Sequence, residues 1–237
     1  MASTLRRGRE VCSTDSGPVS GWPAVASGGG LARDGAVALD NGRVFCMRCD
    51  ALTQLEADRT ANLLRCPGCG NTRPLPSLPL FVVTGASGTG KSAIVDALRR
   101  RLPHCEVFES DLILQVAELG WDRWCDTWLL LAHGIALNGR ATVLCGSLQP
   151  EQLEPLPARP LVGDILFCNL DCPDEVLAER LRARPVWRGW NEQRIAEHQR
   201  FAASLRSRID PTFDTSARSV EEVADLVARW VTGHLRK

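Results

Sequence analysis

The chain has 237 residues, of which 44% are hydrophobic and 24% charged, an ordinary composition for a globular protein. Its 28 basic and 28 acidic side chains cancel, which argues against a nucleic-acid binder that works through a broad basic surface. No apolar run approaches the roughly 20 residues that cross a bilayer, and the N-terminus lacks the apolar core of a secretory signal, so we expect a cytoplasmic protein without membrane association.

Composition divides the chain into four regions. Residues 1–42 are rich in Gly, Ser, Ala and Pro without a sustained period, which predicts a disordered leader. Residues 43–73 form a compact cysteine unit, and the proline-rich residues 74–79 are typical of a semi-rigid linker. From residue 80 to 237, short apolar runs alternate with longer amphipathic segments, which predicts βαβ units and a parallel sheet.

The cysteine unit contains two CxxC pairs separated by 16 residues. The four thiols are Cys46, Cys49, Cys66 and Cys69, and their spacing is typical of a four-cysteine zinc ribbon. A unit of about 30 residues has too little core to fold without such a cross-link, so we expect structural zinc. The alternative is a pair of redox motifs or unrelated thiols. Zinc ribbons dock proteins, nucleic acid or neighbouring domains, and a protein partner stays open here.

The stretch GASGTGKS follows the apolar residues 80–84 and matches the G-x-x-x-x-G-K-[ST] phosphate loop without a gap. Glycines let backbone N–H groups point at an anion, and the following helix places its positive end beneath the phosphates. Lys91 is expected to reach the β and γ phosphates, and Ser92 to ligate magnesium. The predicted nucleotide-binding residues are Gly85, Ala86, Ser87, Gly88, Thr89, Gly90, Lys91 and Ser92. A chance glycine-rich turn is the alternative.

Apolar periods predict the elements of this region in chain order. Strands are expected at residues 80–84, 105–110, 141–147, 164–171 and 211–216. Helices are expected from the loop to about residue 101 and at residues 112–119, 122–138, 173–184 and 191–208. The last helix is expected to begin at Ser219, with Glu222 completing a capping box.

Residues 80–237 resemble the small P-loop kinases, the group that holds nucleoside and nucleotide kinases, gluconate and shikimate kinases and chloramphenicol phosphotransferase. Four stretches carry the resemblance: the phosphate loop, FESD ending at Asp111, CNLDCPDEVLAERLRARP, and DTSARSVEEVADLV, which in this group borders the adenine. The resemblance implies the three-layer P-loop NTPase fold, with a five-stranded parallel sheet covered by helices on both faces. It also implies phosphoryl transfer from ATP, which depends on magnesium and on cations that follow the phosphoryl group.

An acid after the second strand is the first candidate for the base or for a magnesium ligand. Asp111 stands at the end of that strand, where doubly wound sheets bind ligands, and Glu109 is the runner-up on the same face. A plain helix N-cap is the other role open to Asp111. The third strand ends in CGS rather than in an acid, which puts more weight on Asp111. Asp171, at the end of the fourth strand, is expected to be structural.

The segment from about residue 184 to 194 is expected to be the lid over the phosphates. Arginine suits this role because its charge is fixed and its fork of donors matches phosphate oxygens. Arg184 and Arg188 are therefore expected to be catalytic, together with Lys91 and Asp111. A solvated basic face is the alternative for either arginine.

Three tryptophans follow the second strand, in the segment where such kinases bind the acceptor. Trp121, Trp124 and Trp128 share one helical face, so they either stack on a ligand or belong to the core. His133 and His198 are isolated histidines, which we expect to be structural.

These observations predict an ATP-dependent kinase that phosphorylates a small molecule, with a nucleoside or nucleotide as the first expectation. One alternative is a phosphotransferase that acts on an antibiotic-type alcohol. The other is a nucleotide-binding protein that docks a partner through its zinc ribbon. The neutral charge disfavours a nucleic-acid substrate. The expected ligands are ATP, magnesium and structural zinc.

Overall fold

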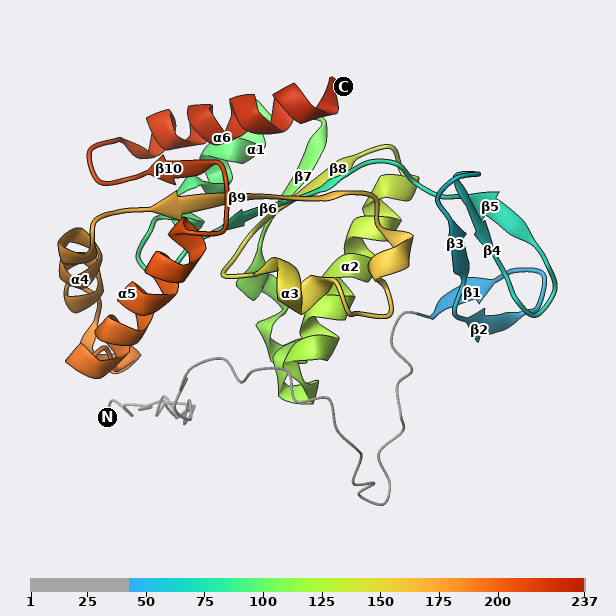
Figure 1. The fold of residues 1–237 in the computed structure, drawn as a ribbon, viewed down its shortest axis with the longest axis horizontal. Helices are drawn as coiled ribbons and strands as arrows, with labels where there is room; N and C mark the ends of the chain where they lie inside the picture. Colours follow the sequence, from blue (N-terminus) through green and yellow to red (C-terminus); the bar gives the residue numbers. More distant parts are fainter. Residues whose placement is uncertain (1–42, 237) are drawn as a thin grey trace, which may run out of the picture. The chain divides into compact units, whose positions relative to one another are not determined.

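The structure is a computed structural model that describes residues 43–236. The predicted leader over residues 1–42 lies outside the described residues, as does Lys237. Within the described part, a small cysteine unit precedes an α/β domain that begins at residue 80 (Figure 1).

A five-stranded parallel sheet forms the centre of the α/β domain. Its strands are β6 (Leu80–Thr84), β7 (Cys105–Glu109), β8 (Ala141–Cys145), β9 (Ile165–Asp171) and β10 (Thr212–Asp214). Their order across the sheet is β10-β9-β6-β8-β7, and every neighbouring pair is parallel. The carboxyl ends of the strands therefore meet at one edge, where β6 leads into the phosphate loop. The five predicted strands and the parallel sheet are confirmed.

Helices cover both faces of this sheet. They are α1 (Val95–Arg101), α2 (Trp121–Leu137), α3 (Pro150–Leu153), α4 (Asp174–Arg182), α5 (Glu192–Arg206) and α6 (Val220–Leu235), with the 3-10 helices η1 (Ser92–Ile94), η2 (Ser110–Leu119), η3 (Arg159–Leu161) and η4 (Val186–Arg188). Phe81 and Val83 of β6 pack with α1 and α6, which lie on one face in Figure 1. Leu80 and Val82 point to the other face and pack with α2. This alternation follows from the period of two of a strand, so both faces of β6 belong to the core.

Three parts of the chain differ from the expectation. Pro74, which we placed in the linker, belongs to strand β5 (Thr72–Pro74) of the cysteine unit. Residues 110–119 form a kinked 3-10 helix, because Ile113 has non-helical angles of φ −117° and ψ 32°. The short helices α3, η3 and η4 were not predicted, since three or four residues are too few to show an apolar period.

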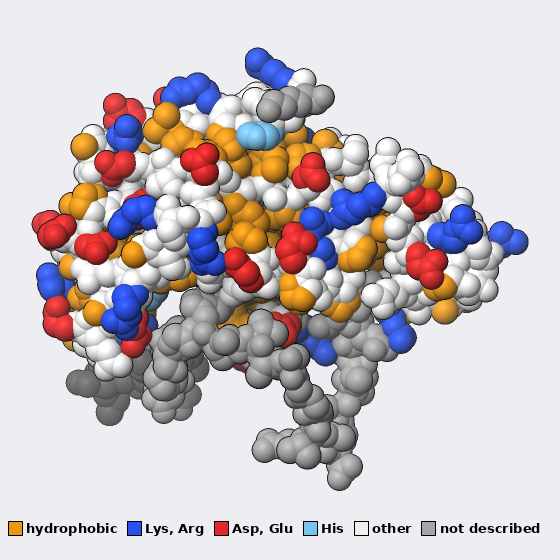
Figure 2. All heavy atoms as spheres, viewed as in Figure 1, with side chains coloured by type: hydrophobic (Ala, Val, Ile, Leu, Met, Phe, Trp, Pro, Cys, Tyr) orange, Lys and Arg blue, Asp and Glu red, His pale blue; other side chains and the backbone are white. Residues whose placement is uncertain are grey.

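Acidic and basic side chains are interspersed over the face of the molecule in Figure 2, without a broad basic patch on that face. This agrees with the equal numbers of the two charges in the sequence. Within residues 43–236, no helix has both the length and the apolar character needed to cross a membrane.

The cysteine unit is a ribbon of two small antiparallel sheets. One pairs β1 (Val44–Cys46) with β2 (Ala51–Thr53), and the other contains β3 (Glu56–Asp58), β4 (Leu63–Arg65) and β5. Each CxxC pair lies on a tight turn. Backbone hydrogen bonds of 2.9 Å close the turns, from Asp50 N–H to Cys46 O and from Gly70 N–H to Cys66 O. Both turns therefore bring two thiols to the same side of the ribbon.

The ribbon and the α/β domain share one hydrophobic cluster. Its buried ribbon members are Cys46, Leu55, Leu64, Cys66 and Leu75, and its members from the domain include Trp128, Leu129, Ala132, Leu161 and Val162. Two of the four ribbon cysteines are thus part of a core that α2 completes.

Polar contacts join the same two parts. Arg59 donates to the carbonyl oxygen of Val162 over 3.0 Å. Arg73 Nη2 lies 3.3 Å from His133 Nε2, and Nδ1 of the same ring lies 3.0 Å from Leu161 O. With its proton on Nδ1, His133 donates to the carbonyl and accepts from Arg73. Burial lowers the pKa of His133, which favours this neutral form. His133 therefore has the structural role that we expected.

Candidate active site

The phosphate loop depends on its first glycine. Gly85 has a φ of 152°, and a side chain there would place its Cβ 2.5 Å from the carbonyl oxygen of Leu170. Gly88 and Gly90 also have positive φ, of 94° and 98°. Such angles favour glycine, so the glycines that define the motif are required by the shape of the loop.

The Lys91 amine lies inside this loop. Its Nζ donates to the carbonyl oxygens of Gly85 and Ala86 over 2.7 and 2.8 Å. Burial lowers the pKa of the amine to about 8, although the charge of Asp111 acts in the opposite direction. Ser147 Oγ also donates to Gly85 O, over 2.9 Å. The amine is thus fixed against the carbonyl groups of the first two residues of the loop.

Two acids lie near the residues that end the loop. Ser92 Oγ donates a hydrogen bond to Oε1 of Glu109, the runner-up. Asp111, our first candidate, is exposed and accepts a hydrogen bond from Ser110 Oγ over 3.2 Å. Both carboxylates raise the pKa of Lys91, Asp111 more strongly. Glu109 therefore lies beside Ser92, the predicted magnesium ligand, whereas the charge of Asp111 acts on the pKa of the Lys91 amine.

The end of β8 offers no ionised acid to the site. Burial raises the pKa of the Cys145 thiol to about 12, so the thiol is neutral. Gly146 follows it and packs against Ser110, whose Oγ would lie 2.2 Å from a Cβ at this position. A larger residue is therefore excluded there. The carboxylates of the site come from the end of β7 and the start of η2.

The two predicted lid arginines have different surroundings. Arg184 Nη1 donates to Ser87 Oγ over 3.3 Å. Arg188 is exposed, and its guanidinium packs 5.1 Å from the ring centroid of Trp187. The structure thus brings Arg184 to the phosphate loop and leaves Arg188 on the exposed turn η4.

Sequence reasoning placed Arg194 at the end of the lid without giving it a role and expected His198 to be structural, but both side chains of α5 lie close to Ser87 or Trp190. The guanidinium of Arg194 is 4.7 Å from the ring centroid of Trp190, and Arg184 packs on that ring at 5.4 Å. His198 Nδ1 accepts a hydrogen bond from Ser87 N–H over 3.4 Å. The spacing of four residues puts Arg194 and His198 on one helical face. That spacing is the feature of the sequence that could have identified them.

A cavity of about 250 Å³ lies beside the phosphate loop. Its walls include Ala93, Ile94, Arg180, Thr215, Val220 and Val223. Arg180 Nη1 donates to Gly88 O over 3.3 Å and to Thr215 Oγ1 over 3.0 Å, and Nη2 donates to Thr215 O over 2.7 Å. The arginine therefore links the loop to the segment before α6. This segment is the one that the sequence resemblance associated with adenine.

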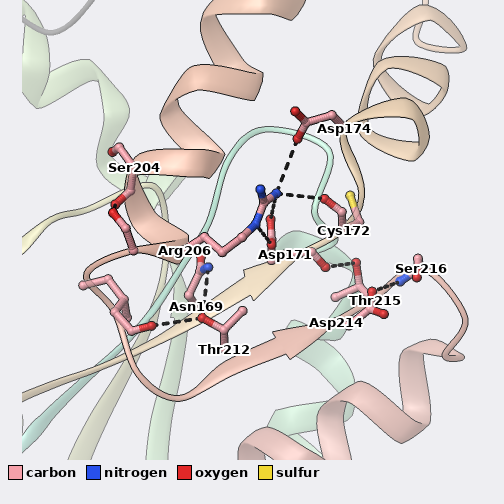
Figure 3. Close-up of polar contacts among 12 residues, drawn as sticks. Asn169, Asp171, Cys172, Asp174, Ser204, Arg206, Thr212, Asp214, Thr215 and Ser216 are labelled. Atoms are coloured by element: carbon pink, nitrogen blue, oxygen red, sulfur yellow. Dashed lines mark hydrogen bonds and ion pairs between the residues drawn. The ribbon is translucent and has the colours of Figure 1, made fainter.

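Asp171, at the end of β9, is held by an arginine of α5 (Figure 3). Nε and Nη2 of Arg206 donate to the two carboxylate oxygens of Asp171 over 2.5 and 3.2 Å. Nη2 also reaches Cys172 O and Asp174 Oδ1, each at 3.4 Å. This bidentate pair fastens α5 to the sheet, which is the structural role that we expected of Asp171.

The three tryptophans of α2 divide between core and surface. Trp124 and Trp128 are 3% and 1% exposed, whereas Trp121 is 43% exposed. Trp121 packs edge-on against Trp124, with 5.5 Å between the ring centroids. Trp128 Nε1 donates to Ser110 O over 3.2 Å, so a core residue of α2 holds the residue before Asp111. Of the three, Trp121 alone presents a large part of its ring to solvent.

The four ribbon cysteines form a site of the size that zinc requires. Their Sγ atoms all lie within 4.8 Å of one another. The distance is 3.7 Å from Cys46 to Cys69 and 3.6 Å from Cys49 to Cys66. A tetrahedral zinc with Zn–S bonds of about 2.3 Å separates its sulfurs by about 3.8 Å, whereas a disulfide bond is about 2.05 Å long. The four thiols therefore fit a zinc ribbon.

No protein-family model and no curated protein sequence matches the chain. Among solved structures, a sugar kinase from a Janibacter species is similar, with 19% identity and a TM-score of 0.50 over 66% of this chain and 95% of that chain. A tunicamycin resistance protein from Deinococcus radiodurans has 20% identity and a TM-score of 0.49 over 65% and 95% of the two chains. Shikimate kinase from Acinetobacter baumannii has 17% identity and a TM-score of 0.47 over 69% and 98%.

The sheet order, the phosphate loop and the likeness to the sugar kinase define the class of fold. The chain has the three-layer fold of the small P-loop kinases, preceded by a four-cysteine ribbon. At this level of identity the likeness extends to the fold.

Proposed function

We propose that the protein transfers the γ-phosphoryl group of ATP to a hydroxyl group of a small molecule. One observation carries the proposal: the Lys91 amine, the Ser92 hydroxyl and the Arg184 guanidinium converge on one loop at the carboxyl edge of a parallel sheet. Phosphoryl transfer depends on positioning and charge neutralisation rather than on covalent chemistry. This set of groups supplies both.

Each residue has one role in this proposal. The backbone N–H groups of the loop and the Lys91 amine bind the β and γ phosphates. Ser92 and Glu109 are the residues that would hold magnesium, which neutralises phosphate charge when bound. Asp111 accepts the proton of the acceptor hydroxyl as its oxygen attacks the γ-phosphorus and ADP leaves. Arg184 neutralises charge on the moving phosphoryl group.

Two further points concern the lid and the nucleotide. Arg188 is kept as a second lid arginine, which reaches the phosphates only if η4 moves toward the loop. ATP is proposed as the donor because the sequence resemblance implies it, and the cavity beside the loop, with its apolar walls and the planar guanidinium of Arg180, suits a base.

The acceptor is proposed to be a neutral alcohol with an apolar or aromatic face, such as a nucleoside or an antibiotic-type alcohol. The segment from Ser110 to Asp122 contains three acids and neither lysine nor arginine. Its exposed apolar side chains are Leu112, Leu114, Leu119 and Trp121. Anionic acceptors are bound by cations, so this surface supports an uncharged acceptor over a nucleotide.

The ribbon is proposed to bind zinc and to brace the α/β domain rather than to recruit a protein partner. Support comes from the shared hydrophobic cluster and from the contacts that Arg59 and Arg73 make with the domain. The zinc is structural in this proposal, because four cysteines leave no open coordination position.

The experiment that tests the function measures ADP release from ATP and magnesium across a panel of acceptors. The panel contains nucleosides, nucleoside monophosphates, sugar acids and uncharged antibiotic-type alcohols. One neutral class is expected to raise turnover many-fold. ATP binding without stimulation by any acceptor would contradict the kinase proposal. Stimulation by a monophosphate or a sugar acid would contradict the proposal of a neutral acceptor but leave the kinase proposal standing.

The two acids are expected to respond differently to neutralisation. Asp111→Asn should lower kcat by about a hundredfold or more, the usual contribution of a general base, with little change in the KM for ATP. Glu109→Gln should instead raise the magnesium concentration needed for half-maximal rate. Magnesium titrations of both variants at saturating ATP distinguish the two effects. The reverse pattern would exchange the roles of the two residues.

A further inference from the structure

His198 lies between the phosphate loop and the lid. Its Nδ1 accepts a hydrogen bond from Ser87 N–H over 3.4 Å, and its ring packs edge-on against Trp190 with 5.0 Å between centroids. Because Nδ1 accepts, the proton of the neutral ring is on Nε2. The imidazole thus contacts both Ser87 of the phosphate loop and the indole of Trp190, on which Arg184 and Arg194 pack.

The surroundings of His198 keep its ring neutral. Burial lowers the pKa of His198 to about 4, and three cations act in the same direction: Lys91 of the loop, Arg194 of α5, and Arg184 after α4. Glu197 acts in the opposite direction. A neutral imidazole can accept the hydrogen bond from Ser87, whereas a protonated ring has two donors and no acceptor. The contact with the loop is therefore available across the physiological pH range.

A second feature of this neighbourhood is a buried donor beside two cations. The indole Nε1 of Trp190 is buried and makes no hydrogen bond with any of the described residues. Buried donors in native proteins are normally satisfied, and two guanidinium groups pack on the same indole. A buried donor with two neighbouring cations is suited to an oxygen-rich anion.

We propose that His198 is a positioning residue for the terminal phosphate of the nucleotide. It holds Ser87 in place through Nδ1, and Ser87 directly follows the two carbonyl groups on which the Lys91 amine lies. The lysine marks the end of the loop that binds the β and γ phosphates, so the Ser87 turn borders the γ-phosphate. The inference rests on the proposed function only in taking a nucleoside triphosphate as the ligand.

Three variants test the contact. In His198→Asn, the side-chain oxygen occupies the place of Nδ1, whereas in His198→Gln it lies one atom further out, where Nε2 was. His198→Ala removes the acceptor altogether. His104→Ala, which changes an exposed histidine of the same domain, is the matched control. Binding of ATP and of ADP, each with magnesium, is measured by titration calorimetry, and thermal unfolding is recorded for every variant.

His198→Ala and His198→Gln are expected to weaken ATP binding by about five- to tenfold, the size of one lost hydrogen bond. ADP binding should change by less than about twofold, since ADP lacks the terminal phosphate. His198→Asn and His104→Ala should bind ATP nearly as wild type does. Equal weakening of ATP and ADP, or equal behaviour of the Asn and Ala variants, would overturn the proposal. So would a wild-type protein that does not prefer ATP to ADP.

These titrations need no acceptor, which separates the inference from the proposed function. If ATP binding responds as expected while no acceptor stimulates turnover, His198 keeps its role and the kinase proposal fails. A His198→Asn variant with wild-type affinity but a lowered unfolding temperature would show that the contact with Ser87, and not general stability, determines binding.

Discussion

Lys91→Ala is expected to lower acceptor-stimulated ADP release by about a hundred- to a thousandfold, the cost of removing one preorganised charge from a transition state. The amine is fixed by two carbonyl groups at 2.7 and 2.8 Å, so in the proposed role its charge is held at the loop before the nucleotide binds. Lys91→Arg should not restore activity, because a planar guanidinium cannot occupy the place of a compact ammonium group. The measurement is initial rate against ATP concentration with the acceptor saturating.

Arg100→Ala is the matched control for this prediction. Arg100 is a cation on the helix that follows the loop, but it is exposed and pairs with Glu221 at the surface. The rate of the Arg100→Ala variant should stay within about threefold of wild type, since exposed ion pairs contribute little to stability. A Lys91→Ala variant that is folded and retains more than a tenth of the activity would contradict the proposed role of the amine.

Cys66→Ser is expected to destabilise the α/β domain as well as the ribbon. Cys66 is 1% exposed and belongs to the cluster that α2 completes. Zinc-binding free energy is folding free energy, and each 1 kcal/mol corresponds to about 2–4 °C in a domain of this size. We expect loss of bound zinc and a fall of at least about 10 °C in the midpoint of thermal unfolding. Tryptophan fluorescence, to which the buried Trp124 and Trp128 contribute, follows the transition.

The control for the ribbon is Cys172→Ser, which alters an equally buried thiol outside it. This variant should retain its zinc and lose only a few degrees. If Cys66→Ser loses zinc while the tryptophan transition stays in place, the ribbon is an independent module. The docking hypothesis would then replace the bracing hypothesis.

The phosphate loop and the sheet could be predicted because each follows from a short local pattern. The glycines of residues 85–92 have backbone angles that other residues rarely adopt, so their positions in the sequence predict the shape of the loop. The buried run of β6 predicts a strand covered on both faces. The zinc site could be predicted in the same way, because the spacing of the four ribbon cysteines is itself a short local pattern.

The rest of the site depends on contacts between distant segments, which no local pattern records. His198 and Ser87 are hydrogen-bonded although they stand 111 positions apart in the chain. The residues next to His198 in the sequence do not distinguish it from any other isolated histidine. Glu109 ends β7 and Asp111 stands two residues later, and no local pattern shows that Ser92 Oγ donates to Glu109 rather than to Asp111. Trp121 and Trp124 share a helical face, but the start of α2 leaves the first exposed and buries the second.

The amine inside the loop also has a consequence for covalent chemistry. The chain contains two lysines, Lys91 and Lys237, and burial lowers the pKa of Lys91 to about 8. Near neutral pH, a larger fraction of this amine is therefore unprotonated and nucleophilic than of an ordinary lysine. A triphosphate carrying an acylating group would label Lys91 selectively, and an internal peptide of a digest would report occupancy of the nucleotide site without any knowledge of the acceptor.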